Sequence, residues 1–222
     1  MSYERWKAVD DFVGELLVGA DVPLDEAVAR STREGLPAIA VSPPQGKFLY
    51  LLARIHGARR VLELGTLGGY STIWLARALP RDGVVVTLEL DPRYAQVAGE
   101  NFARAGVADM VEQHVGPALD TLRELRTQDT EPFDMVFIDA DKQTTPEYFT
   151  ECVELTRRAG VIVVDNVVRD GEVAVADSDD AGARGMRRFH EQLTESPRWS
   201  ATTIQTVGVK GYDGFTLVLL DE

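Results

Sequence analysis

The feature that most constrains the fold is a short apolar strand that runs into a glycine-rich turn and then into a helix. It covers residues 61–72 and reads Val-Leu-Glu-Leu-Gly-Thr-Leu-Gly-Gly-Tyr-Ser-Thr. Glycines at such a turn let the backbone approach a ligand where a Cβ atom would clash. In a doubly wound α/β sheet, the first strand-to-helix turn is a common cofactor site. The motif therefore predicts either a ligand site or a tight turn that packing alone requires.

The rest of the chain repeats this alternation of strand and helix. Five strands are expected, each followed by a helical pattern or a loop, over residues 60–64, 84–89, 111–115, 133–138 and 160–164. Strands connected in this way form a parallel sheet with helices on both faces. Two further runs, residues 200–207 and 215–220, have no helix between them and must pair antiparallel.

The N-terminal residues 1–57 are predicted to form a helical layer ahead of the Rossmann-like core of residues 58–222, within a single domain of 1–222. Apolar residues recur at helical spacing over 6–17, and a second helix is expected over 24–33. Ser42, followed by two prolines and a glutamine, reads as the start of a third helix. We expect this layer to cover the sheet edge, to form a dimer contact, or both.

Two later segments complete the expected fold. Residues 169–180 are rich in Asp, Gly and Ala and are predicted to form a long, mobile loop. A helix is expected after it, over residues 183–193.

The formal net charge of −13 argues against a nucleic-acid partner, because phosphate binding needs clustered Lys and Arg. It also disfavours an anionic substrate unless a local basic patch exists, and it suits a cationic ligand. The single cysteine, Cys152, excludes an intramolecular disulfide and favours a reducing compartment. Acidic residues near the start are unlike a signal peptide, and no apolar run is long enough to span a bilayer. A cytoplasmic protein without a membrane partner is expected.

Glu89 ends the second strand, about two dozen residues after the glycine turn. An acidic residue there can accept hydrogen bonds from both ribose hydroxyls of a nucleoside cofactor. The alternative is that Glu89 caps the helix that begins at Pro92, but Asp91 already fills that position. The spacing Gly65-x-x-Gly68-Gly69, with Glu63 before it, differs from the dinucleotide fingerprint G-x-G-x-x-G.

Asp139, Asp165 and Asn166 form an all-oxygen set at the ends of two later strands. Two carboxylates and an amide suit a hard divalent ion such as Mg²⁺. The alternative is that they only form turns and helix caps, but carboxylates that end apolar strands are costly to bury without a partner. Lys142 can reach the same place and act as a base beside a metal, or it can be a solvated surface lysine.

Taken together, these motifs resemble the cation-dependent O-methyltransferases that use S-adenosylmethionine, the family of catechol and caffeoyl-CoA O-methyltransferases, including bacterial members. The resemblance runs from about Ser42 to the C-terminus and rests on Glu63 to Ser71, Glu89, the run 138–142, and Asp165-Asn166. It implies a class I methyltransferase fold, a doubly wound seven-stranded sheet whose last strand is antiparallel.

The resemblance also implies roles for residues of this chain. S-adenosylmethionine would be bound by Val41, Glu63, Gly65, Thr66, Ser71, Glu89, the turn Gly116-Pro117-Ala118, and Asp139. Asp139, Asp165 and Asn166 would hold the cation, with Mg²⁺ expected and Mn²⁺ or Ca²⁺ as alternatives, while Lys142 and Asp139 would be catalytic. The acceptor would be a small catechol or phenol, and a homodimer is expected.

The sequence departs from the family at two places near the expected acceptor. Thr144 and Thr145 stand where many relatives have Asn-Tyr, and Arg169 stands where many have Trp. The identity of the acceptor therefore cannot be inferred from a plant or animal relative. The only basic cluster, Arg184 with Arg187 and Arg188, reads more simply as a solvated helix face than as a coenzyme A site. Two alternatives to the methyltransferase are a nicotinamide-dependent oxidoreductase and a non-catalytic module that keeps the cofactor pocket.

Overall fold

The protein is represented by a computed structural model that describes residues 2–128 and 130–221. Its contacts divide the chain into two compact units, residues 1–118 and 119–222. The single domain expected from the sequence stays a prediction. Within the described residues, no helix combines the length and the apolar character needed to cross a bilayer.

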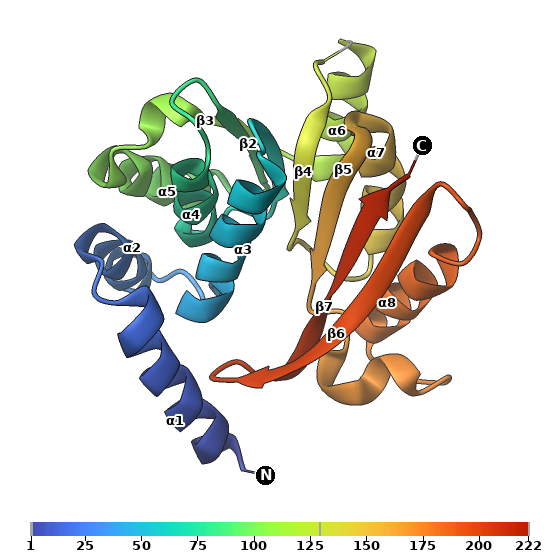
Figure 1. Ribbon diagram of the computed structural model, residues 1–222, viewed down its shortest axis with the longest axis horizontal. Helices are drawn as coiled ribbons and strands as arrows, with labels where there is room; N and C mark the ends of the chain where they lie inside the picture. Colours follow the sequence, from blue (N-terminus) through green and yellow to red (C-terminus); the bar gives the residue numbers. More distant parts are fainter. Residues whose placement is uncertain (1, 129, 222) are drawn as a thin grey trace. The chain divides into compact units, whose positions relative to one another are not determined.

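The first unit is built on three parallel strands (Figure 1), in the order β3-β2-β1. They are β1 (Arg60–Leu64), β2 (Val84–Glu89) and β3 (Val111–Val115), with the bounds predicted from the sequence. The pairing is in register to the carboxyl ends, where Glu89 lies opposite Val115. The polar residues at these strand ends therefore share one edge of this three-stranded part of the sheet.

Helices pack around these strands because their apolar faces match the buried strands. They are α2 (Val22–Arg33), α3 (Pro43–His56), α4 (Tyr70–Ala78) and α5 (Pro92–Ala105), with a short 3-10 turn η2 (Ala108–Met110) before β3. All residues of α4 except Arg77 are buried. The two predicted caps are confirmed: Ser42 accepts from Gln45 N at 3.4 Å, and Asp91 accepts from Arg93 N at 2.8 Å.

The first helix of the unit contributes no buried residue. The sequence predicted one helix over 6–17, whereas the chain forms α1 (Tyr3–Val13) and then a π-helical turn η1 (Gly14–Val18). In Figure 1, α1 projects away from the other helices of its unit. Phe12, Leu16 and Leu17 form an apolar stripe along α1 and η1. Phe12 and Leu17 are 64% and 69% exposed, so no other part of this unit buries the stripe.

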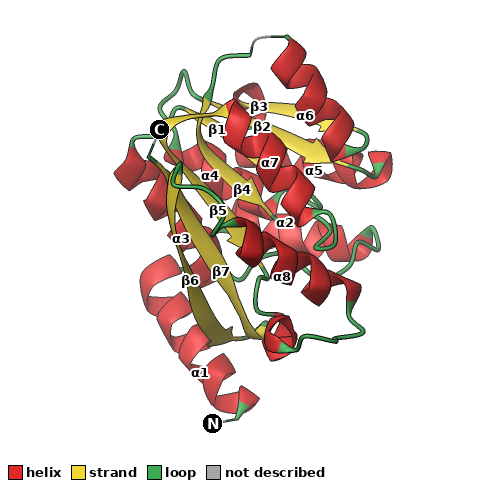
Figure 2. Cartoon of the chain, turned by 90° about the vertical axis from the view of Figure 1, so that its right-hand side faces the viewer, coloured by secondary structure: helices red, strands yellow, loops and turns green. Residues whose placement is uncertain are grey.

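The second unit contains four strands in the order β4-β5-β7-β6 (Figure 2). They are β4 (Phe133–Ile138), β5 (Thr156–Asp165), β6 (Trp199–Gly208) and β7 (Gly211–Leu220). β4 and β5 are parallel, and β7 is antiparallel to both β5 and β6. The antiparallel C-terminal pair is therefore confirmed, and the two strands are longer than the sequence pattern indicated.

The start of β5 corrects the predicted end of the preceding helix. The helical sequence pattern continues to about Arg157, but α7 (Thr145–Leu155) ends two residues earlier and the strand begins at once. Thr156 Oγ1 donates to Cys152 O at 2.6 Å, and Arg157 Nε donates to Asp134 Oδ1 at 2.5 Å. The side chain of Arg157 therefore binds Asp134 at the start of β4. The local sequence around Arg157 could not reveal this partner.

The remaining helices of the second unit are α6 (Ala118–Thr127), α8 (Ala181–Gln192) and a 3-10 segment, η3 (Arg169–Ala174). α7 and α8 lie side by side on one face of the four strands (Figure 2). The prediction of a continuous loop over 169–180 is wrong at its start, where η3 forms. Ser178 Oγ donates to Glu172 Oε2 at 2.7 Å, which ties the second half of the segment to the first.

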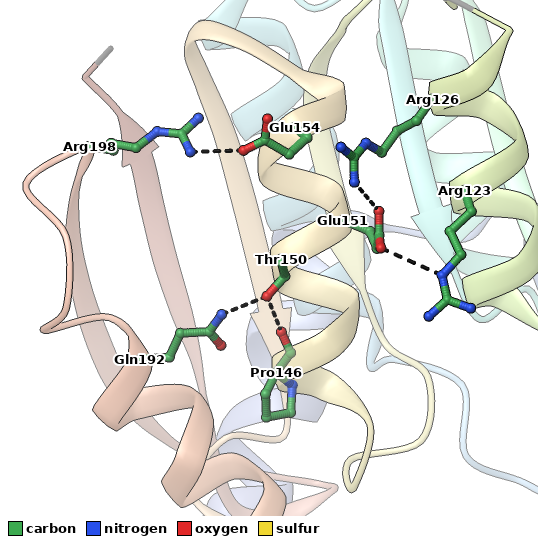
Figure 3. Close-up of polar contacts among 8 residues, drawn as sticks. All are labelled: Arg123, Arg126, Pro146, Thr150, Glu151, Glu154, Gln192 and Arg198. Atoms are coloured by element: carbon green, nitrogen blue, oxygen red, sulfur yellow. Dashed lines mark hydrogen bonds and ion pairs between the residues drawn. The ribbon is translucent and has the colours of Figure 1, made fainter.

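Polar contacts hold α7 to its neighbours on both sides (Figure 3). Glu151, whose side chain is mostly buried, accepts from Arg126 Nη1 at 2.7 Å and lies 3.7 Å from Arg123 Nε, both on α6. On the other side, Arg198 Nη1 donates to Glu154 at 2.8 Å. These contacts connect α7 to α6 on one side and to the start of β6 on the other.

Candidate active site

The glycine turn after β1 has a backbone that favours glycine. Gly65 and Gly69 have φ values of +97° and +80°, and Leu67 between them has +50°. Gly65 N donates to Leu88 O at 3.0 Å, which ties the turn to the end of β2. Positive φ is costly for residues that carry a Cβ, so the glycines at 65 and 69 are a conformational requirement.

Packing accounts for the other demand on this turn. A Cβ at Gly68 would lie 2.0 Å from Ser31 Oγ, and one at Gly69 would lie 2.3 Å from Phe102 Cε1. Asn101 Nδ2 donates to Gly68 O at 2.9 Å from the same helix as Phe102. For these two glycines, the alternative that packing alone requires the tight turn therefore applies. A side chain at either position would prevent α2 or α5 from approaching the turn.

Glu63 lies at the centre of a buried cluster of hydroxyl groups. Its carboxylate accepts from Ser71 Oγ at 2.6 Å, from Thr72 Oγ1 at 2.5 Å and from Thr87 Oγ1 at 2.7 Å. Since the proton of Thr87 is used there, the 2.7 Å contact between Thr66 and Thr87 has Thr66 as donor. The cluster joins β1, β2 and the start of α4, and these bonds offset the cost of burying the carboxylate.

Glu89 is the acidic residue at the end of β2, and its carboxylate faces the turn. Oε2 accepts from Leu67 N at 2.7 Å, and Oε1 accepts from Asp91 N at 2.9 Å. Each oxygen keeps a lone pair for another donor, as two ribose hydroxyls would require. Its backbone carbonyl accepts from Gly116 N at 2.9 Å, so the two glycine turns meet at the end of β2.

The other residues predicted for the cofactor lie around this edge. Gly116 has a φ of +144° and open space where a Cβ would be, and Pro117 and Ala118 follow it into α6. Val41 is buried and precedes the cap of α3. The N-terminus of α4 has no side-chain cap, so its amides can receive an anionic group. These features fit a nucleoside cofactor with a carboxylate.

In the second unit, Asp139 and Asp165 follow the paired residues Ile138 and Val164 by one position, on adjacent parallel strands. Neighbouring strands are about 4.8 Å apart, so the two carboxylates start from neighbouring backbone positions. Asn166 comes next with a φ of +55°, and its N–H donates to Asp165 Oδ1 at 2.9 Å. Asn tolerates this left-handed conformation better than most residues, which explains its place at the turn.

Lys142 is brought to Asp139 as predicted. Its Nζ lies 2.5 Å from Asp139 Oδ1, and both side chains are largely shielded from solvent. The backbone of Lys142 is held by α8, because a Cβ at Gly185 would lie only 2.2 Å from Lys142 O. Arg188 Nη2 donates to the next carbonyl, Gln143 O, at 2.9 Å.

The proposed donor set consists of two carboxylates and one amide, and it contains neither histidine nor cysteine. Over the described residues, no group of three or more His, Cys, Asp and Glu side chains is placed to hold an ion. Two carboxylates with an amide oxygen are the kind of set that leaves positions for water or substrate around Mg²⁺. The Lys142 ammonium against Asp139 shows that this carboxylate attracts a positive charge. The residues fit a hard divalent cation and not zinc.

Sequence reasoning missed Asp213, the residue that holds the turn after Asn166. Its Oδ1 accepts from Val168 N at 2.9 Å, Arg169 N at 3.0 Å and Gly214 N at 2.9 Å. The only local signal was its position in a polar, glycine-rich connection between the last two strands. Val168 and Arg169 are more than forty residues away from Asp213, so the sequence pattern did not reveal these two contacts.

The departures from the family pattern have structural partners. Asp141 accepts from Thr144 N at 3.1 Å and from Tyr148 OH at 2.7 Å, which starts α7. Burial is the first cause that raises the pKa of Tyr148. The second threonine, Thr145, is buried.

The basic cluster on α8 faces solvent, as the sequence suggested: Arg184 and Arg188 are exposed, and Arg187 is half-buried. Its three arginines each donate to a backbone carbonyl, those of Ser178, Val173 and Gln143. They therefore hold the surrounding loops to α8. Cys152 is a fully buried thiol whose pKa is raised by that burial, as expected for a structural cysteine.

Comparison with known proteins agrees with this arrangement. The sequence profile of the O-methyltransferase family matches residues 19–220. A catechol O-methyltransferase of Mycobacterium tuberculosis is 56% identical over 212 residues, which cover 96% of this chain and 94% of that protein.

Two solved structures share the whole fold. The O-methyltransferase TomG of Streptomyces achromogenes, involved in tomaymycin synthesis and solved with SAM, superposes with a TM-score of 0.96 at 55% identity over all of both chains. The O-methyltransferase of Bacillus cereus, solved with SAH, gives a TM-score of 0.97 at 50% identity over 99% of this chain and 100% of that one.

The expected fold class, an α/β class I methyltransferase sheet of seven strands with an antiparallel last strand, is thereby confirmed. The profile and the identities also overturn the oxidoreductase alternative, because they place the whole core in a group-transfer family. The chain belongs to the O-methyltransferase family and is an O-methyltransferase.

Proposed function

We propose that this enzyme methylates one of two adjacent hydroxyl groups on a small catechol-type acceptor, with S-adenosylmethionine as donor and a divalent cation, Mg²⁺ first, as cofactor. The observation that carries the proposal is the oxygen set of Asp139, Asp165 and Asn166 at two adjacent strand ends, with Lys142 Nζ 2.5 Å from Asp139. The name of the mycobacterial relative, catechol O-methyltransferase, supports the acceptor class.

The donor is proposed to bind at the strand ends of the first unit. Glu89 accepts the ribose hydroxyls with its free lone pairs, and the open Gly116 turn with Pro117 and Ala118 lies against the adenine. The methionine end is proposed to be held by Val41, Glu63, Gly65, Thr66, Ser71 and Asp139. The acidic overall charge suits this cationic donor.

The proposed chemistry divides between the bound groups and the chain. Bound S-adenosylmethionine supplies an electrophilic sulfonium methyl group, and a bound divalent cation polarises the acceptor hydroxyls and fixes their position. Asp139, Asp165 and Asn166 hold that cation. Lys142, whose Nζ lies 2.5 Å from Asp139 Oδ1, would take the hydroxyl proton. Positioning for direct displacement accounts for much of the rate.

The experiment is methyl transfer to catechol with and without EDTA, beside calorimetric titration of S-adenosylmethionine. Turnover should require the metal. Asp165→Ala should abolish metal-dependent turnover, because it removes a cation ligand, while cofactor affinity stays within about threefold. A fully active variant would refute the ligand assignment. Cofactor binding without methylation of any catechol would favour the remaining alternative, a non-catalytic module.

We also propose a homodimer. Its support is the apolar stripe of α1 and η1, which includes Phe12, Leu16 and Leu17 and is exposed in the chain by itself. Exposed apolar stripes of this kind mark interaction sites more often than free surface. The predicted cytoplasmic location stays a prediction, supported by a single, buried cysteine.

A further inference from the structure

Arg169 presents a guanidinium group that the protein uses only in part. It lies three residues after Asn166, and Nη2 donates to Asp180 Oδ2 at 3.1 Å. Nε is buried and has no hydrogen-bond partner among the described residues. The side chain as a whole is 34% exposed. Since the guanidinium carries five N–H donors and the side chain is partly exposed, its outer N–H groups remain available to a ligand.

The backbone of Arg169 is held in an unfavourable conformation. Its φ is +55°, and the next residue, Asp170, also has a positive φ, of +53°. Asp213 fixes this turn through the Arg169 N–H at 3.0 Å. A non-glycine residue in this conformation persists only where the surroundings enforce it, and such positions cluster at functional sites. The backbone from which the Arg169 side chain extends is therefore held in place by the turn.

The guanidinium also lies beside the proposed base. A Cβ built on Gly182, at the start of α8, would lie 3.3 Å from Lys142 Cβ and 3.5 Å from Arg169 Nε. Arg169 and Lys142 therefore flank the same glycine, and the tip of Lys142 reaches Asp139. Arg169 therefore supplies a positively charged group near the proposed base, which an anionic acceptor needs in a chain with a net charge of −13.

We propose that Arg169 determines acceptor specificity by binding a carboxylate on the acceptor, so that the preferred substrates are catechols that carry an acid group. The proposal rests on the proposed function, because it describes the substrate class of the same site. Arginine presents its N–H groups in a planar fork that matches a carboxylate with two parallel hydrogen bonds. Within the protein, the carboxylate of Asp180 competes with an acceptor carboxylate for the Arg169 guanidinium. Asp180 also caps α8, because its Oδ1 accepts from Ala183 N at 2.9 Å.

The test compares two acceptors of nearly the same shape, protocatechuate and its uncharged amide, at saturating S-adenosylmethionine and Mg²⁺. In the wild-type enzyme, KM should be lower for the acid than for the amide. Arg169→Met should raise KM for the acid about tenfold or more and change KM for the amide by less than about threefold. Arg169→Lys keeps the positive charge but loses the planar pair of N–H donors. Its KM for the acid should lie between those of the wild type and Arg169→Met.

Asp180→Asn is the matched control for a purely structural role. Its amide oxygen can still cap α8, but it no longer competes as an anion for Arg169, so KM for the acid should stay the same or fall. If Arg169 only ties its turn to α8, then Arg169→Met should change both acceptors by the same factor, and Asp180→Asn should do likewise. If the wild type is active on both acceptors and the variants show that pattern, the inference about Arg169 is overturned, but the proposed function is not. A wild type that methylates neither acceptor would overturn the proposed function as well.

Discussion

Glu89 and Asp91 lie two residues apart and share one turn, yet the structure gives them different tasks. Asp91 caps α5 by accepting from Arg93 N, while Glu89 accepts from Leu67 N of the glycine turn. The sequence left open whether Glu89 was only a cap. Since the cap position is filled, the carboxylate of Glu89 is available for a ligand at the strand edge.

Glu89→Gln should weaken S-adenosylmethionine binding by about tenfold to a hundredfold, because hydrogen bonds to a charged group contribute about 1.5–3 kcal/mol. Calorimetric titration measures the dissociation constant. Asp91→Ala is the control: loss of a cap should lower the free energy of unfolding by about 1 kcal/mol and leave the dissociation constant nearly unchanged. Equal weakening by both variants would show that only the local fold of this turn matters.

At the scale of elements, the glycine turn is where β1, α2, α4 and α5 come together. Gly69 combines two demands, a φ of +80° and a Cβ position 2.3 Å from Phe102. Gly106, at the end of α5, has the conformational demand alone, with a φ of +69° and nothing within 4 Å of its Cβ position. The pair separates backbone strain from packing.

Gly106→Ala should lower the free energy of unfolding by about 1–2 kcal/mol, the cost of a left-handed conformation for a residue with a Cβ. Gly69→Ala should cost that amount and about 1–3 kcal/mol more, because Phe102 must move from a filled core. Denaturant unfolding followed by circular dichroism measures both. Equal losses would mean that the side chain of Phe102 yields freely, contrary to the packing described here.

The regular elements could be predicted closely from the sequence because their signals are local. The bounds of β1, β2, β3 and β4 follow from apolar runs between turn residues, and the caps at Ser42 and Asp91 follow from residue type. The end of α7 and the segment η3 were missed, because each depends on side chains that contact distant parts of the chain. Arg157 pairs with Asp134, and Arg169 with Asp180 and Asp213.

At the scale of the whole molecule, the first unit carries the proposed cofactor residues apart from Asp139, and the second carries the proposed cation ligands. The chain also leaves the apolar stripe of α1 and η1 exposed. Within one chain, exposure of Leu17 and its neighbours costs hydrophobic free energy that a second copy would recover, at about 25 cal/mol per Å² buried.

Leu17→Asp should therefore convert a dimer into a monomer, because a charge at a buried apolar contact is not compensated. Sedimentation velocity of wild type and variant measures the change in mass. Val175→Asp is the control, since Val175 is also exposed but lies in a different segment, after η3. A wild type that sediments as a monomer at all concentrations, or a variant that remains a dimer, would remove the proposed interface.

The order of strands and helices along the chain, the residues at the strand ends and the donor types of the proposed cation set follow from the sequence alone. These are properties of residue type and local spacing, and Asp139, Asp165 and Asn166 could be identified without coordinates. The supports of these residues became visible in three dimensions: the hydroxyl cluster around Glu63, the contacts of α2 and α5 that require Gly68 and Gly69, and the bonds of Asp213 to the turn of Arg169. Most of these supports join residues that lie far apart in the chain, such as Glu63 with Thr87 and Asp213 with Val168, and local sequence patterns do not indicate such partners.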